Sequence, residues 1–311
     1  MPRIGEPRAP ARPATDDQEN RRGAILSAAS RLGSANEIDR IQAQEIAAEA
    51  GVALRTLYRY YPSKHHVFAA VLDEQVSRFR PPAPSGNPAD DIAGVMVAAC
   101  RALGVEVRTV ATDLVSPLAV AELASVTDDL EVGLFIYNAG ANTCSAEFLD
   151  ADLADFQRVV DLNITTMMAL TQHYGRLMRE RRRGGILLVG SMSGYLGSVR
   201  HTVYGGVKAY GRIFAEGLWL ELRDHGVDVL ELVLGVTRTP AMERVGLNFD
   251  VPGMRVADPA DVAREGLEQL PNGPVFVAGG NAEDVARRND PDRTKVVAGA
   301  HRMMQKLMGL K

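Results

Sequence analysis

The sequence predicts a small all-helical domain followed by a larger α/β domain built on a parallel sheet. Residues 21–79 carry apolar side chains at the spacing of helices. After Gly104, short apolar runs alternate with helical segments, which is typical of β/α units whose sheet is covered on both faces. A Pro-rich break, PPAPSGNP at 81–88, separates the two patterns, and 311 residues suffice for two domains.

The N-terminal part contains a tail and a set of short helices. Residues 1–20 begin with prolines and arginines and lack apolar periodicity, so we expect a disordered tail. Helices are expected at 21–33, at 43–50, at 54–60 and, capped by Ser63, through Phe79. The third helix ends before Pro62, because the residue preceding a proline is disfavoured in helical conformation. The first domain therefore spans 21–80, and 81–102 form the break and a connecting amphipathic helix.

The C-terminal part, residues 103–311, contains the predicted β/α units. Strands are expected at 105–111, 132–137, 185–189, 227–234 and 274–278. Two long helices are expected at about 155–181 and 203–224. No internal repeat is visible.

The composition excludes several classes of protein. Apolar residues make up 46% and charged residues 24%, which is ordinary for a globular chain. No apolar run approaches the roughly 20 residues that cross a bilayer, and no signal peptide is visible. The two cysteines, Cys100 and Cys144, lie in no metal-ligand spacing. We therefore expect a cytoplasmic protein without a membrane partner or a bound metal.

Residues 41–64, IQAQEIAAEAGVALRTLYRYYPSK, have the layout of a helix-turn-helix. Gly51 suits the tight turn, and the small side chains of Ala47 and Ala50 allow the two helices to approach closely. The second helix presents polar groups outward, as a helix that reads DNA does. Residues 1–102 carry a net charge of +1 and residues 103–311 one of −5, and this mild asymmetry permits such a contact without requiring it.

This stretch resembles the DNA-binding domain of TetR-type repressors. The matching segments are IL at 25–26, IAAEAGV at 46–52 and TLYRYYPSK at 56–64. The resemblance implies that double-stranded DNA is the partner, with contacts from Gln42, Arg55, Thr56, Tyr58, Arg59, Tyr60 and Lys64. Such domains bind as dimers. In that family a helical C-terminal domain makes the dimer, and we expect a homodimer here as well.

The second domain carries a pattern suited to proton transfer. On a helix, Tyr204 and Lys208 are one turn apart and face the same way. A phenol with a pKa near 10 is a poor acid–base catalyst at neutral pH, so a neighbouring ammonium must favour the phenolate. Ser191 stands thirteen residues before the tyrosine, after an apolar strand.

Together with Asn138-Ala139-Gly140 and Asn163, this pattern resembles the short-chain dehydrogenases/reductases. The resemblance implies a Rossmann-like, doubly wound parallel sheet. It also implies a catalytic set in which Tyr204 exchanges the proton, Ser191 binds the reacting oxygen, Lys208 holds the nicotinamide ribose and Asn163 supports a proton relay. The implied cofactor is NAD or NADP. Its expected contacts are Asp113, Asn138, Ala139, Gly140, Tyr204, Lys208, Gly235, Thr237 and Thr239.

One part of that pattern is missing. Residues 1–104 contain no Gly-x-x-x-Gly-x-Gly turn after a strand, so the doubly wound sheet is expected to be incomplete. The strand at 105–111 then either moves beside 132–137 or leaves an exposed edge. The cofactor's pyrophosphate also loses the helix N-terminus that normally binds it, and we expect affinity to fall severely.

Three interpretations follow from the sequence. In the first, the chain is a DNA-binding regulator with a reductase-derived body. Whether this regulator also binds a small-molecule ligand is left undecided by the sequence. In the second, it is an active NAD(P)-dependent oxidoreductase with an accessory DNA-binding domain. In the third, two partial families have been joined with little function in either half.

Overall fold

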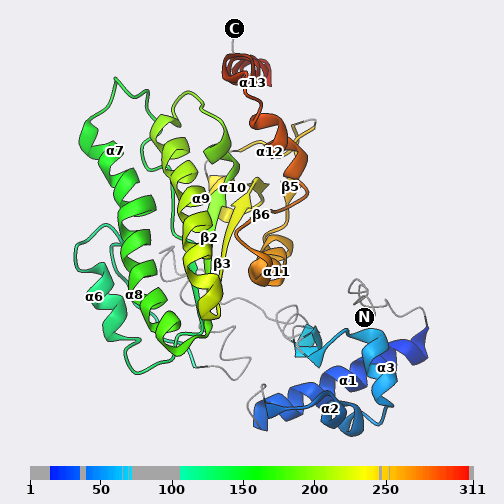
Figure 1. Ribbon diagram of the computed structural model, residues 1–311. Coiled ribbons are helices and arrows are strands. Elements are labelled where there is room, and N and C mark those ends of the chain that lie inside the picture. Colours follow the sequence, from blue (N-terminus) through cyan, green and yellow to red (C-terminus); the bar gives the residue numbers. More distant parts are fainter. Residues whose placement is uncertain are drawn as a thin grey trace. The chain divides into compact units, whose positions relative to one another are not determined.

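The computed structural model describes residues 15–35, 40–64, 66–68, 70–71, 106–244, 247–251 and 253–307. The chain forms two compact units, Met1–Ala111 and Thr112–Lys311. We call them the head and the body and describe each by itself (Figure 1). The predicted connecting helix, at about 90–103, lies outside the described residues.

The head is helical, as predicted. Its elements are α1 (Asp16–Ala35), α2 (Ala43–Glu49), α3 (Leu54–Tyr60) and helical residues within 64–71. Helix α1 begins at Asp16, so the predicted tail 1–20 is too long. The first turn of α1 carries Asp16, Asp17 and Glu19, and carboxylates are favourable at the positive end of a helix.

The head's core fixes the angle between α2 and α3. Ile25 of α1, Ile46 of α2 and Leu57 of α3 are fully buried in one cluster. Gly51 takes a φ of +66°, a left-handed conformation that suits glycine in the turn between the helices. The helix-turn-helix arrangement of this segment is therefore confirmed.

The body contains a parallel sheet with strand order β1-β2-β3-β6. These strands are β1 (Leu134–Tyr137), β2 (Gly184–Ser191), β3 (Val227–Leu234) and β6 (Val275–Val277). The long central strands β2 and β3 pair from Gly184↔Val227 to Ser191↔Leu234. A separate two-stranded sheet joins β4 (Val236–Thr237) to β5 (Val256–Ala257).

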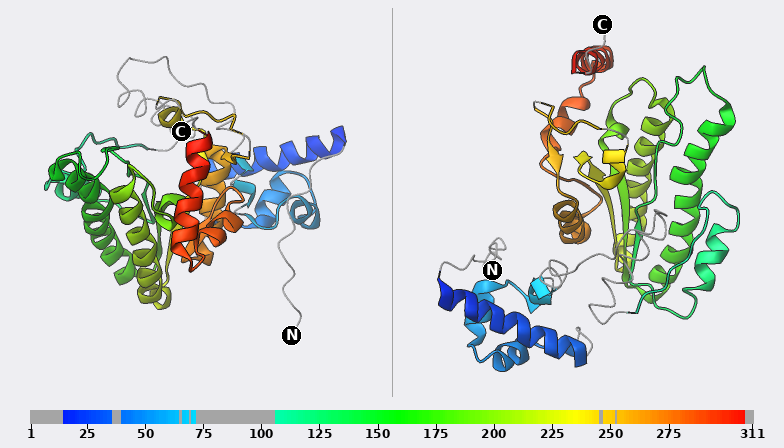
Figure 2. Two further views of the ribbon diagram at one scale, coloured as in Figure 1. Left: turned by 90° about the horizontal axis from the view of Figure 1, so that it is seen from above. Right: turned by 180° about the vertical axis from the view of Figure 1, so that it is seen from behind.

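Helices cover both faces of this sheet. The helices of the body are α6 (Ala119–Ser125), α7 (Leu153–Val160), α8 (Thr166–Arg181), α9 (Thr202–Leu222), α10 (Pro240–Arg244), α11 (Pro259–Gln269), α12 (Ala282–Arg288) and α13 (Arg293–Leu307). Helices α8 and α9 lie on one side, and α11 lies on the other (Figures 1 and 2). The predicted α/β architecture is confirmed.

The alternation of side chains along the central strands builds the two layers. Ile186 and Val229 are buried in the cluster that contains α8 and α9 residues. Leu187, one residue after Ile186, and Leu232, three residues after Val229, point to the other face and pack with Val262 of α11. The central strands are therefore buried on both faces, as expected of parallel sheets.

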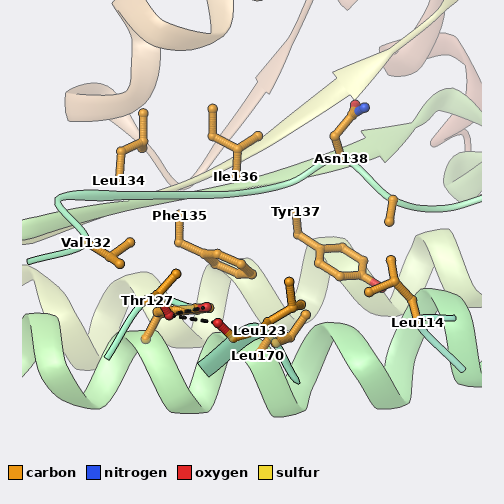
Figure 3. Close-up of a pocket in the computed structure, with 12 residues that line it drawn as sticks. Leu114, Leu123, Thr127, Val132, Leu134, Phe135, Ile136, Tyr137, Asn138 and Leu170 are labelled. Atoms are coloured by element: carbon orange, nitrogen blue, oxygen red, sulfur yellow. Dashed lines mark hydrogen bonds between the residues drawn. The ribbon is translucent and has the colours of Figure 1, made fainter. Parts of the chain in front are cut away.

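The β1 edge of the sheet departs from one prediction. Residues 106–111, expected as a strand, form no strand, and β1 pairs only with β2 among the described residues. Leu134 and Ile136 are 38% and 46% exposed, and their side chains point away from α8 (Figure 3). A strand forms only against a neighbour, and no described strand pairs with residues 106–111. The second expected outcome, an exposed edge, is the one found.

Within the described ranges, no helix is long and apolar enough to cross a membrane.

Candidate functional site

The carboxyl ends of β1 and β2 bring the predicted catalytic residues together. Residues 138–140 follow β1, Ser191 ends β2, and Tyr204 and Lys208 lie in the first two turns of α9. In open parallel sheets, ligands bind at this edge. The backbone therefore places the predicted site where the fold class places its ligands.

Tyr204 and Ser191 interact at the mouth of this site. Burial of the phenol raises the pKa of Tyr204, and a hydrogen bond with the Ser191 hydroxyl opposes that rise. Ser191 Oγ also accepts a hydrogen bond from the backbone N–H of Ser193 at 3.1 Å, which orients its side chain. We expected the neighbouring ammonium to lower the pKa of Tyr204, but the net shift in the structure is upward because desolvation outweighs the stabilising contacts.

Lys208 is directed toward the sheet. Its Nζ donates a hydrogen bond to the Val189 carbonyl at 3.1 Å and lies 5.8 Å from the centre of the Tyr204 ring. Burial lowers the pKa of Lys208, and the charge of Glu231 raises it. The Lys208 ammonium therefore interacts with the Val189 carbonyl of β2 as well as with the ring of Tyr204 on α9.

Asn163 lies in a π-helical segment, Asp161–Thr165, between α7 and α8. Its Nδ2 donates to the carbonyls of Val159 at 2.9 Å and Ala141 at 3.1 Å, which ties the segment to the loop after β1. Its buried Oδ1 has no hydrogen-bond partner among the described residues. Such π-bulges are frequent at functional sites, and the sequence pattern gave no signal of this one.

Gly140 shows how closely these groups approach. A Cβ atom at Gly140 would lie 2.7 Å from both Asn163 Oδ1 and Lys208 Nζ. Any side chain at this position would displace both polar groups. The structure thus gathers Asn163, Ser191, Tyr204 and Lys208 at one place, with an accessible glycine backbone beside them.

The segment after β3 carries the last three predicted cofactor contacts, Gly235, Thr237 and Thr239. Thr237 is buried and its hydroxyl lies 3.5 Å from the Gly235 carbonyl. Thr239 Oγ1 accepts a hydrogen bond from the N–H of Met242 at 3.3 Å. Asn281, which the sequence interpretation missed, is buried, and a Cβ at Gly235 would lie 2.7 Å from its Nδ2.

The remaining predicted cofactor residues lie in polar or open surroundings. Asp113 is exposed, accepts a hydrogen bond from the N–H of Val115 at 3.1 Å and lies 3.9 Å from Arg158. Asn138 is exposed and Ala139 half-buried at the end of β1. Asp113 is thus committed to a local turn rather than directed to the catalytic set.

An apolar groove runs beside β1. It has a volume of about 290 Å³ and is lined mainly by apolar side chains, among them Leu114, Leu123, Phe135 and Leu170 (Figure 3). Its polar contact is a hydrogen bond of 3.1 Å between Thr127 and Tyr174. This lining suits apolar groups and offers no cationic side chain to a pyrophosphate.

Tyr137 ends β1, and its phenol reaches the π-helical segment. Its hydroxyl donates to the Leu162 carbonyl at 2.5 Å, and burial raises the pKa of Tyr137 to about 12. This tyrosine therefore braces the π-helical segment next to Asn163.

In the head, helix α3 has one face exposed to solvent and one face buried in the core. Arg55, Tyr58 and Arg59 are exposed, and Thr56 is half-buried. Leu57 and Tyr60 are buried. The predicted contact of Tyr60 with DNA is therefore wrong for this conformation, because its hydroxyl is buried in the head core.

Two further predicted DNA contacts have local roles. Lys64 Nζ donates to the Ile41 carbonyl at 2.9 Å, so its ammonium supports the start of α2 instead of lying free on the surface. Gln42 is exposed, and its backbone N–H donates to Glu45 Oε2 at 2.6 Å, a contact that stabilises the N-terminus of α2.

Comparisons with known proteins find a different family in each unit of the chain. The model of the tetR family of bacterial regulatory proteins matches residues 25–71, so the head is a TetR-type DNA-binding domain. The model of the short chain dehydrogenases matches residues 89–248, half of the chain. The chain belongs to the short-chain dehydrogenase/reductase family. Its body has that family's Rossmann-like parallel fold.

Curated relatives of this short-chain dehydrogenase/reductase are oxidoreductases. A 7beta-hydroxysteroid dehydrogenase of Clostridium sardiniense is 30% identical over 201 residues, covering 64% of this chain and 77% of that protein. A very-long-chain 3-oxoacyl-CoA reductase of Podospora anserina is 30% identical over 154 residues, covering 49% of this chain but only 45% of that protein.

Solved structures support the fold of the body. A 7beta-hydroxysteroid dehydrogenase matches with a TM-score of 0.62 at 22% identity, over 68% of this chain and 83% of that one. A short-chain dehydrogenase from Sphingobium yanoikuyae, in complex with NADPH, matches with a TM-score of 0.55 at 24% identity, over 72% and 83%.

Proposed function

We propose that this chain is a DNA-binding regulator of TetR type whose body is a short-chain dehydrogenase/reductase domain without tight capture of NAD(P). The observation that carries the proposal is that α3 has one exposed and one buried face. Arg55, Tyr58 and Arg59 are exposed, whereas Leu57 and Tyr60 are buried in the core of the head. Because such a regulator must reach DNA, we also propose that the chain acts in the cytoplasm.

The outer face of α3 suits a DNA groove. Arginine forms bidentate contacts with guanine and also binds phosphates, so Arg55 and Arg59 supply both kinds of contact. The guanidinium of Arg59 lies 5.4 Å from the centre of the Tyr60 ring, a cation–π contact that limits its freedom. Tyr58 adds an exposed phenol between the two arginines.

We propose that the body makes the dimer. Helix α8 exposes Met168 and Leu177, and helix α9 exposes Ile213 and Leu220. Exposed apolar side chains on adjacent helices favour association with a second copy. A dimer presents two heads to a palindromic site, whose half-sites lie about 34 Å apart for one turn of DNA.

The test begins with selection of bound sequences from random duplexes, followed by gel shifts on the selected operator. We expect a dimer to bind one palindrome and Arg55→Ala to weaken binding by 1–3 kcal/mol, mostly on the selected bases. Arg264→Ala, an exposed arginine of the body that pairs with Asp261, is the control and leaves binding unchanged. A monomer that binds every duplex equally would contradict the proposal.

A second candidate function is an NAD(P)-dependent oxidoreductase, favoured by the gathering of Asn163, Ser191, Tyr204 and Lys208. The nicotinamide end of such a cofactor fits this site. Asn163 Oδ1 has no hydrogen-bond partner among the described residues, and the exposed backbone of Gly140 lies beside it. When bound, the nicotinamide supplies hydride exchange with a carbonyl or alcohol carbon.

In that function the chain's own side chains handle the proton. Lys208 would hold the ribose, and Ser191 would donate a hydrogen bond to the reacting oxygen. Tyr204 would give that oxygen a proton or take one from it, as general acid–base catalysis requires. The pyrophosphate end fits less well, because the described residues beside β1 form an apolar groove without cationic side chains.

The two candidates differ in a direct assay. An oxidoreductase binds NADH or NADPH with micromolar affinity and converts a trial hydroxysteroid, the substrate class named for its relatives. Tyr204→Phe would then reduce turnover by about 10²–10⁴-fold. Tyr210→Phe is the control, since that phenol contacts Met168 on the helix surface. Absence of turnover in the wild-type chain favours the regulator.

A further inference from the structure

The turn Met192–Tyr195, directly after β2, is bound by the C-terminal part of the body. Arg288, the last residue of α12, donates a hydrogen bond from Nη1 to the Met192 carbonyl at 2.8 Å. Arg293, the first residue of α13, donates one from Nη2 to the Tyr195 carbonyl at 3.1 Å. The first and the last residue of the turn are therefore each held by an arginine from a distant part of the sequence.

The two arginines and the turn form one connected unit. Arg293 also donates a hydrogen bond to the Arg288 carbonyl, which joins the end of α12 to the start of α13. Met192 and Tyr195 pack in an apolar cluster with Val285 of α12. Arg288 is half-buried, and its hydrogen bond to the turn compensates for the water that the guanidinium loses.

The same turn contacts the backbone of α9. A Cβ at Gly194 would lie 2.8 Å from the carbonyl carbon of Lys208 and 2.9 Å from its oxygen. A Cβ at Gly205, the residue after Tyr204, would lie 3.1 Å from the Ser193 carbonyl oxygen. The turn therefore lies directly against the two helical turns that carry Tyr204 and Lys208.

The backbone of the turn also orients the Ser191 side chain. The N–H of Ser193 donates a hydrogen bond to Ser191 Oγ at 3.1 Å. Because the oxygen accepts this bond, the hydroxyl proton is available to a second partner, and the Ser191 hydroxyl is hydrogen-bonded to Tyr204. The position of the turn thus decides where the serine hydroxyl points.

We propose that Arg288 and Arg293 are positioning residues that clamp the turn Met192–Tyr195 against α9 and so hold the Ser191 hydroxyl beside Tyr204. Neither arginine contacts Ser191 or Tyr204 itself among the printed hydrogen bonds, so both act through the backbone of the turn. The consequence for proton transfer rests on the oxidoreductase function proposed above. The orientation of Ser191 depends only on the folded body.

The experiment is an NMR measurement on the full chain, labelled with carbon-13 at Cζ of tyrosine. The chemical shift of this carbon responds to hydrogen bonding of the phenol oxygen. The sequence has eight tyrosines, and the Tyr204 signal is assigned by its loss in Tyr204→Phe. Ser191→Ala gives the position of the signal without the serine hydroxyl. We expect Arg288→Met to move the Tyr204 signal most of the way to that position.

Matched variants separate positioning from attachment of the C-terminal helices. Arg287, the neighbour of Arg288, is exposed and pairs with Asp284, so Arg287→Met should leave the Tyr204 signal unchanged. Arg288→Lys keeps a donor and should return the signal toward its wild-type position. If Arg288 only attaches α12 to the body, Arg288→Met would lower stability without moving the Tyr204 signal. That result would overturn the proposal.

Arg293 keeps the test decisive if Arg288→Met does not fold, because Arg293 is exposed and easier to replace. Arg293→Met should move the Tyr204 signal in the same direction and make the Ser193 amide exchange up to about tenfold faster, as loss of one hydrogen bond does. An unchanged Tyr204 signal in Arg293→Met, or in Ser191→Ala, would overturn the proposal. The measurement needs neither cofactor nor DNA, so its failure is distinct from the failure of either candidate function.

Discussion

The ammonium of Lys208 donates a hydrogen bond to the carbonyl of Val189, 3.1 Å away, and this contact joins α9 to the end of β2. It places Nζ next to Gly140 and the orphaned Oδ1 of Asn163. The side chains predicted to transfer the proton are therefore brought together at the carboxyl ends of β1 and β2, on the π-helical segment and on α9. The part that would bind a pyrophosphate belongs to a β-α-β segment that the sequence does not contain before residue 105.

Ionisation of Glu231 should make the body less stable as pH rises. Its folded-state pKa, about 8, exceeds its ordinary value of 4.5, so its contribution to folding is complete below 4.5 and lost as pH rises through 8. Between pH 5 and 8 we expect a loss on the order of 4 kcal/mol. Urea unfolding followed by the single tryptophan, Trp219 of α9, measures this in the body.

Glu231→Gln should flatten this pH dependence, because the amide does not ionise. Glu216→Gln, which changes a partly exposed carboxylate, should retain the wild-type slope. Equal slopes for wild type and Glu231→Gln would show that the buried carboxyl is not the titrating group.

Lys64 and Arg59 should differ in how they affect DNA binding. Arg59 is exposed, and Arg59→Ala should lower the salt dependence of binding by about one counterion. Lys64 Nζ bonds to the Ile41 carbonyl, so Lys64→Met should cost about 1 kcal/mol of head stability and leave the salt slope unchanged. Hydrogen exchange of α2 and α3 measures the first effect of Lys64→Met. A reduced salt slope for Lys64→Met would instead assign this lysine to a phosphate.

Ile136 and Ile186 provide a test of the open edge. Ile136 of β1 is 46% exposed, and Ile186 of β2 is fully buried. Ile136→Ala should therefore cost less than about 1 kcal/mol, whereas Ile186→Ala should cost about 2–5 kcal/mol. Unfolding monitored by Trp219 compares them. Comparable losses would mean that another part of the chain covers β1.

Asn163 should matter for stability independently of any reaction. Its Nδ2 joins the Val159 and Ala141 carbonyls, so Asn163→Ala leaves two acceptors without their donor. We expect a loss of about 1–3 kcal/mol in the unfolding free energy of the body. Thr165→Ala, at an exposed position of the same π-helical segment, is the control and should change it little. Similar losses for both would point to the segment's backbone as the source.

Much of the fold could be predicted because it depends on local pattern. The predicted strand 227–234 coincides with β3, and the helix predicted at 203–224 is α9, Thr202–Leu222. The helix-turn-helix could be predicted because Gly51 and the small alanines leave few other conformations. The side chains of the predicted catalytic set come together in the structure, since their spacing is fixed by one strand end and one helix; their catalytic role stays a prediction.

Other features depend on contacts between distant segments. Residues 106–111 have strand-like composition but form no strand, and no described strand pairs with them. Tyr60 was predicted on the DNA face, yet it packs inward at the end of α3. Glu231 interrupts an apolar strand, VDVLELVL, which was a visible signal that only the packing of Gly190 and Gly211 explains.

The most direct test of the central claim is a calorimetric titration of the full chain with NADH and with NADPH. The claim is that the body keeps its proton-transfer side chains without tight dinucleotide binding. We predict that neither cofactor binds with a dissociation constant below about 1 mM, which corresponds to roughly 4 kcal/mol of binding free energy. Micromolar binding of either dinucleotide would contradict the claim and establish the body as a cofactor-binding reductase.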